Sequence, residues 1–104
     1  MARTYPISNP RLERDRDRDR RDTRDSQLLV ARDDLVQLLA SEQGRRVAAR
    51  ILREAMTRQS VFNQNAMVMS ANAGKQELGL WLARELRDAD LTNYLRMQSE
   101  NDDA

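Results

Sequence analysis

Apolar residues recur at steps of three and four along most of the chain after residue 27, which predicts helices. No run alternates with the period of two that strands require. Asp33 and Asp34 are expected to open a short helix, because carboxylates are favourable at a helix N-terminus. Ser41 is a good N-cap for a second, longer helix that runs to about Met56. The predicted fold is all-α: two main helices plus two short flanking helices, with an extended N-terminal arm.

The longest predicted helix covers about residues 65–88. Its apolar positions read as one continuous stripe, made of Met67, Ala71, Gly74, Leu78, Trp81, Leu82 and Leu86. Trp81 is therefore expected in the core. Asp90 is expected to cap a last short helix, whose inner side carries Leu91, Tyr94 and Leu95.

Residues 57–65 form the main break between the two main helices, because Ser, Gln and Asn are frequent there. Val61 and Phe62 are an apolar pair inside this break. Phe62 is the only phenylalanine of the chain. We expect the pair to plug the core.

Composition divides the chain into an arm (1–27), a helical domain (28–98) and an acidic tail (99–104). Between positions 11 and 25 the arm holds seven arginines and six acidic residues. A tract with so few apolar side chains does not offset the entropy of ordering, so it should be disordered in isolation. It is either a solvated tail or an arm that docks on a neighbouring protein through Tyr5, Ile7 and Leu12. The interleaved aspartates argue against contact with nucleic acid, because phosphates require uncompensated cations.

The 104 residues include no cysteine and no histidine. Thiolate nucleophiles, imidazole bases and the usual zinc ligands are thereby excluded. No spacing of carboxylates resembles a calcium-binding loop, and no glycine-rich phosphate loop is present. We therefore expect no catalytic residue, no metal and no cofactor, and predict that the protein is not an enzyme.

The net charge is only +1, so no strong field attracts a polyanion. In the second helix Arg46, Arg50 and Arg53 lie opposite the apolar stripe. Glu42 and Glu54 stand one turn from Arg46 and Arg50, which predicts a salt-bridged solvent face. A DNA-recognition helix in this segment is disfavoured for the same reason.

No apolar run approaches the roughly 20 residues of a membrane-spanning helix. Residues 1–10 lack the apolar region of a signal peptide. The chain is therefore expected to be made and retained in the cytoplasm unless another component carries it elsewhere.

Three residues of the longest helix are candidates for binding a partner: Gly74, Gly79 and Leu80. Glycine is unfavourable inside a helix, so each glycine requires a packing reason. Either the glycines serve the packing of the domain's own second helix, or they form a groove for a partner. Leu80 lies off the core stripe and is either an ordinary surface leucine or part of an interface.

The order and spacing of several blocks of residues resemble those of a family of small tailed-bacteriophage proteins. The family is named after a head-region open reading frame of a Bordetella phage. The blocks are Leu38-Leu39, Glu42, Gly44-Arg45-Arg46, Val61-Phe62, Asn65-Ala66, Gly74 to Leu82, Ala89-Asp90 and Tyr94. The resemblance covers about residues 33–97. It implies a role in phage morphogenesis or in the virion and carries over no catalytic residue.

These observations predict a structural virion protein that docks at the portal, the head–tail junction or the head interior. Other phage structural proteins, of the portal, adaptor or capsid class, are the expected partners, with several copies in a symmetric assembly. The alternative is a transient assembly or DNA-packaging accessory factor. A structural virion protein is expected to be made in the host cytoplasm and to end in the virion.

Overall fold

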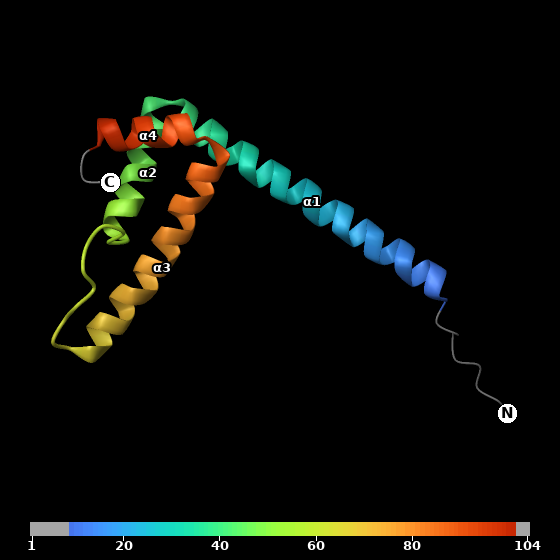
Figure 1. Cartoon of the computed structure of the whole chain (residues 1–104), viewed down its shortest axis with the longest axis horizontal. Helices are drawn as coiled ribbons and strands as arrows, with labels where there is room; N and C mark the ends of the chain where they lie inside the picture. Colours follow the sequence, from blue (N-terminus) through green and yellow to red (C-terminus); the bar gives the residue numbers. More distant parts are fainter. Residues whose placement is uncertain (1–8, 102–104) are drawn as a thin grey trace. The chain divides into compact units, whose positions relative to one another are not determined.

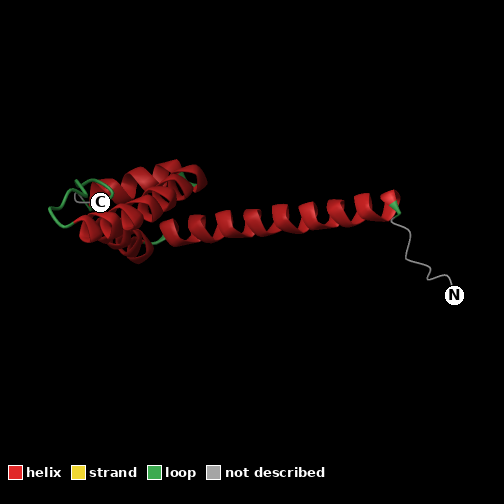
Figure 2. Ribbon diagram, turned by 90° about the horizontal axis from the view of Figure 1, so that it is seen from below, coloured by secondary structure: helices red, strands yellow, loops and turns green. Residues whose placement is uncertain are grey.

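The computed structural model describes residues 9–101 and contains four helices there (Figures 1 and 2). They are α1 (Pro10–Ala40), α2 (Glu42–Glu54), α3 (Ala66–Ala89) and α4 (Leu91–Glu100). Residues 9–101 include no strand, so the all-α prediction is confirmed. The chain divides after Ala31 into two compact units, and Arg32 begins the second.

Residues 10–27 are helical, so the predicted extended arm is wrong for this stretch. The helix begins at a local signal: the Asn9 side chain accepts a hydrogen bond from the Arg11 N–H at 3.0 Å. Pro10 follows at the first helical position, where its fixed φ suits a helix and its missing N–H costs nothing. Glu13 stands in the first turn, where a carboxylate is favourable.

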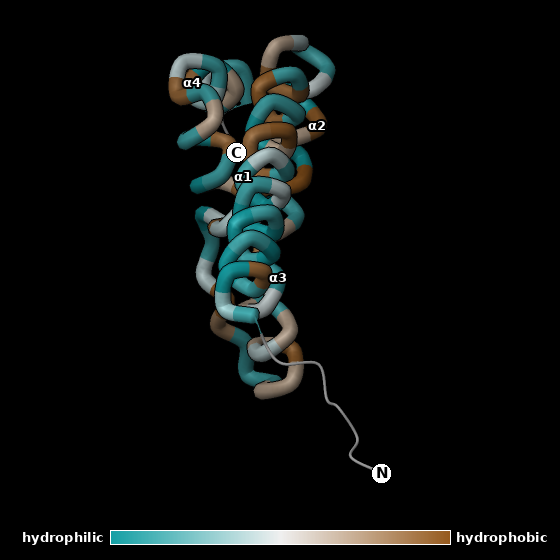
Figure 3. Tube along the Cα trace, turned by 90° about the vertical axis from the view of Figure 1, so that its right-hand side faces the viewer, coloured by the Kyte–Doolittle hydropathy of each residue, from teal (hydrophilic) through white to brown (hydrophobic). Residues whose placement is uncertain are grey.

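Alternating charges allow ion pairs along this helix. Residues three apart lie on the same side, so single-residue alternation places opposite charges at that spacing, and like charges at a spacing of four. Asp17 and Arg20 show such a pair at 4.0 Å. No glycine or proline interrupts residues 11–43, and the helix continues through Asp33, where a separate short helix was expected. Figure 3 colours the N-terminal part of α1 mostly as hydrophilic.

The predicted caps Ser41 and Asp90 are confirmed, and Asn65 caps the helix that was predicted to start at about residue 65. The Ser41 hydroxyl accepts a hydrogen bond from the Gly44 N–H at 2.9 Å and begins α2. The Asn65 side chain accepts from the N–H groups of the next helix, and Asp90 accepts from the Asn93 N–H at 3.0 Å. Each signal is local to a few residues, which is why the pattern located it.

The second unit is built around a small core. Helices α2, α3 and α4 pack against one another in all three pairings (Figure 1). The buried apolar residues are Leu39, Ala48, Ala49, Leu52, Leu86 and Met97, with Leu35, Leu38, Leu82, Ala83 and Tyr94 packed against them. The end of α1 thus contributes to this core.

Gly44 is required where the chain turns from α1 into α2. A Cβ at this position would collide with the carbonyl oxygen of Leu38. Real Cβ atoms never approach backbone so closely, so any larger residue would push the two helices apart. The glycine therefore fixes the approach of α2 to the end of α1.

Candidate functional site

Helix α3 carries two apolar stripes where the sequence predicted one. The first faces the core and contains Gly79, Leu82, Ala83 and Leu86. The second contains Met67, Ala71, Gly74, Leu78 and Trp81, and all five of its residues are exposed. We call this second set the α3 stripe. Its steps of four, three, four and three residues place it along one side of the helix.

Trp81 is 51% exposed, so its predicted place in the core is wrong. The contact of Gly79 explains the difference. A Cβ at position 79 would collide with the Ala55 side chain and come within 2.8 Å of the Thr57 methyl group. Gly79 thus faces the end of α2, and Trp81, two residues on, points about 200° away around the helix.

Phe62 does not plug the core, because 76% of its surface is exposed. The loop is instead held by a polar anchor. The side-chain amide of Gln76 donates hydrogen bonds of 2.8 Å to the carbonyl oxygens of both Met56 and Gln59. Met56 has a φ of 59°, a left-handed conformation that reverses the chain after α2.

The predicted partner-binding residues fall into three groups. Gly74 is open, since a Cβ there would meet nothing within 4 Å, and Leu80 is 40% exposed. Gly79 is buried in the domain's own packing and is not available to a partner. Leu12 is exposed on α1, whereas Tyr5 and Ile7 lie outside the described residues.

Arg45 is a buried charge that the sequence interpretation missed. It is 3% exposed, and its Nε and Nη2 donate hydrogen bonds to the two carboxylate oxygens of Glu100 at 2.9 and 3.1 Å. Its Nη1 donates to the Leu39 carbonyl oxygen at 3.0 Å. Arg45 stands one turn before Ala48 and Ala49, so helical phase alone could have placed it inside α2.

The pair shifts both ionisation equilibria toward the charged forms. Hydrogen bonding to Glu100 raises the pKa of Arg45. Hydrogen bonding from Arg45, together with the positive charges of Arg45 and Arg96, lowers the pKa of Glu100. Glu100 is the C-terminal residue of α4, so the first two residues of the predicted acidic tail (99–104) belong to this helix.

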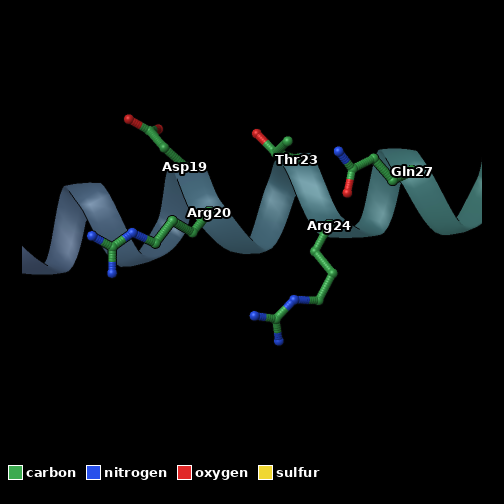
Figure 4. Close-up of a pocket in the computed structure, with 5 residues that line it drawn as sticks. All are labelled: Asp19, Arg20, Thr23, Arg24 and Gln27. Atoms are coloured by element: carbon green, nitrogen blue, oxygen red, sulfur yellow. The ribbon is translucent and has the colours of Figure 1, made fainter.

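The exposed face of α2 carries arginines without the predicted ion pairs. Neither Glu42–Arg46 nor Arg50–Glu54 lies within ion-pair distance. A shallow hollow on this face is lined by Gln43, Arg46, Val47, Arg50, Arg53 and Asn101. A second hollow lies on α1, where Figure 4 shows Asp19, Arg20, Thr23, Arg24 and Gln27 projecting from successive turns of a single helix. Neither hollow is enclosed.

Residues 9–101 hold no cluster of three carboxylates that could bind a metal ion. In the same stretch no helix is both long enough and apolar enough to cross a bilayer. The second unit exposes apolar side chains and arginines, which are groups that suit contact with another macromolecule.

A family model described as Bbp19-like phage protein matches residues 35–99. The chain belongs to the Bbp19-like phage protein family. The match confirms the resemblance read from the sequence, and it includes Arg45 and the whole α3 stripe. The charged stretch of α1 before residue 35 lies outside it. No curated protein and no solved structure matches the chain significantly.

Proposed function

We propose that the protein is a non-enzymatic structural component of a tailed-phage virion, which docks onto other virion proteins through its helical unit. The observation that carries the proposal is the amount of apolar surface left uncovered by a core of six residues. Every packed helix exposes large apolar side chains: Val47 and Ile51 on α2, Met67, Leu78 and Trp81 on α3, and Leu91 and Leu95 on α4. Exposed apolar side chains of this size are candidates for burial against a partner protein.

Family membership supports a phage role, and the chemistry of the surface supports binding over catalysis. A sequence without histidine or cysteine has no common nucleophile–base pair. Exposed arginines and apolar side chains are typical of protein interfaces. The proposal therefore assigns no catalytic residue and no cofactor.

The portal, the head–tail junction and the head interior are the proposed locations. Proteins there form symmetric rings or shells, and each copy needs a neighbour of the portal, adaptor or capsid class. Symmetric assemblies bury the same patch on every copy. A small subunit with a marginal core gains much of its stability from such burial.

Quantitative mass spectrometry of purified virions tests the proposal. A structural component is expected at a fixed copy number relative to the portal protein. Absence from mature virions but presence in immature particles would instead indicate a transient assembly or packaging factor. Absence from both would overturn the proposal.

A matched pair of variants tests whether the exposed Phe62, in the loop after α2, belongs to the docking surface. Phe62→Ser removes an exposed apolar side chain and should reduce incorporation into particles, with little effect on folding. Gln64→Ser changes an exposed polar residue of the same loop and should leave incorporation unchanged. Equal incorporation of both variants would exclude Phe62 from the docking surface.

A further inference from the structure

The α3 stripe has a bulky half and a smaller half, which meet at Gly74. Gly74 stands at its midpoint, seven residues from Met67 and seven from Trp81. On one side of Gly74 lie the bulky Leu78 and Trp81, and on the other the small Ala71 and the flexible Met67. A Cβ at position 74 would meet nothing within 4 Å, so another backbone has room to approach there.

We infer that α3 binds α3 of a second copy of this chain, antiparallel, about a twofold axis at Gly74. In this arrangement, positions equally far from Gly74 in opposite directions face each other. Trp81 then packs on Met67 of the second copy, a sulfur–aromatic contact. Leu78 fills the space beside Ala71 of the second copy, and the two Gly74 residues allow close approach of the helices.

Parallel pairing does not fit the same sequence of sizes. It would place Trp81 on Trp81 and Leu78 on Leu78, with Ala71 on Ala71 and Gly74 on Gly74. Bulky layers would hold the helices apart while small layers left voids, and voids are unfavourable in packed interfaces. The division of the stripe into a bulky and a smaller half thus favours the antiparallel arrangement.

The exposed area is sufficient for a dimer at the weak end of the range. Met67, Leu78 and Trp81 are 83%, 66% and 51% exposed. Together they offer roughly 400 Å² of apolar surface per copy, and the stems of flanking residues bring the total for two copies to about 1,000 Å². This is about the lower limit of specific interfaces, so the dimer should form at micromolar concentrations.

The flanks of the stripe add a salt dependence. Lys75 lies on one flank and Glu77 on the other. Antiparallel helices place equal flanks together, so Glu77 comes close to Ser70 of the second copy, which lies one residue off its level, and Lys75 lies near its own equivalent. The lysine repulsion is exposed and screened by salt. Added salt should therefore tighten the dimer, whereas an interface held by ion pairs would loosen.

Analytical ultracentrifugation of the full chain, from about 1 to 200 µM, tests the inference. The mass should rise from one chain, 12.1 kDa, to two chains and go no further. Gly74→Gln should raise the dimer dissociation constant at least about tenfold. It should not harm the monomer, because glutamine is a better helix former than glycine and has open space there. Ala73→Gln, on an exposed position away from the stripe, is the matched control and should leave the constant unchanged.

Cysteine cross-linking tests the orientation and the position of the axis, because the chain has no cysteine of its own. A mixture of Met67→Cys and Trp81→Cys chains should form a disulfide-linked heterodimer, and Met67→Cys alone should not, whereas parallel pairing would reverse both results. Gly74→Cys should form a disulfide-linked dimer under mild oxidation, since the twofold axis brings the two Cα atoms within bonding range. Ala73→Cys should not. A chain that stays monomeric at every concentration, a dimer unaffected by Gly74→Gln, or equal cross-linking at both positions would overturn the inference. These outcomes are independent of whether the protein is found in virions.

Discussion

Arg45 of α2 and Glu100 at the end of α4 form a two-pronged ion pair across 55 residues of sequence. The third donor of the same guanidinium binds the carbonyl oxygen of Leu39, near the end of α1. One side chain thus joins three helices that have few apolar contacts to share. Only arginine offers this planar fork of donors, so lysine would not replace it.

Removing the glutamate should destabilise the fold more than removing the arginine. The Arg45 side chain is 4% exposed and that of Glu100 is 30% exposed. Glu100→Ala leaves a buried guanidinium without its anion, whereas Arg45→Met leaves a carboxylate that water can reach. We expect Glu100→Ala to lower the Tm by roughly 10 °C, and Arg45→Met to lower it less. Thermal unfolding followed by circular dichroism measures both. A larger loss for Arg45→Met would mean that the pair is solvated.

The same pair predicts how stability depends on pH. Its hydrogen bonds lower the pKa of Glu100 in the folded state, so the folded chain binds fewer protons there than the unfolded chain. The pair's contribution is complete above the ordinary carboxyl pKa of about 4.3 and is lost as the pH falls through the lowered folded pKa. The stability gap between the natural chain and Glu100→Gln should therefore be constant from pH 5 to 8 and shrink below about pH 4. A gap that stays constant into acid would contradict the assignment.

Trp81→Ala and Leu86→Ala separate the two stripes of α3. Leu86 is fully buried, so its truncation should cost about 2–5 kcal/mol. Trp81 is half exposed, so its truncation should cost less than about 1 kcal/mol when the chain is monomeric. Urea unfolding at low protein concentration gives both values. Equal costs would place Trp81 in the core after all.

The two glycines of α3 should respond oppositely to alanine. At protein concentrations at which the chain is monomeric, Gly74→Ala adds a methyl group in open space and should stabilise the helix by about 1 kcal/mol. Gly79→Ala drives a methyl group against Ala55 and Thr57 and should destabilise the fold by about 1–3 kcal/mol. Denaturant unfolding of the two variants measures both changes. Because both replace glycine by alanine inside a helix, the change in helix propensity is the same, and the difference between the two variants reports the packing at position 79. Stabilisation by both substitutions would show that the end of α2 moves to accommodate the added methyl group.

Local signals made much of the fold predictable. Ser41, Asn65 and Asp90 each cap a helix through atoms two or three residues away, so a short stretch of sequence contains all the information. The boundaries of α2, α3 and α4 follow from these caps. The same local reasoning fails for α1, because its low apolar content predicts disorder, whereas Asn9 and Pro10 start a helix.

The candidate site was less predictable, because long-range contacts decide it. Met67, Trp81 and Leu86 all belong to apolar stripes, and helical periodicity cannot tell which stripe faces inward. That choice is made by Gly79 against Ala55, residues that the loop brings together. In the same way, the burial of Arg45 depends on Glu100, which a pattern local to α2 does not contain.

Truncations at two points should show where the folded unit begins. The second unit starts at Arg32, and the residues of α1 that reach its core are Leu35, Leu38 and Leu39. Deleting residues 1–31 should therefore leave the remaining residues helical by circular dichroism, and the second unit should still unfold cooperatively. Deleting residues 1–39 removes the fully buried Leu39 and should abolish cooperative unfolding, because the cost of emptying one such site, about 2–5 kcal/mol, is a large part of the stability of a small domain.

The shorter truncation also tests the charged stretch of α1 in assembly. If that stretch docks on a neighbouring virion protein, the chain without residues 1–31 should fold normally but enter particles at a lower copy number. Several exposed ion pairs must act together for this, since each contributes only about 0–1 kcal/mol. Because salt screens exposed ion pairs, the difference in copy number between the full and the truncated chain should then shrink when particles are assembled at higher salt. Full incorporation of the truncated chain would show that this stretch is a solvated helix with no part in docking.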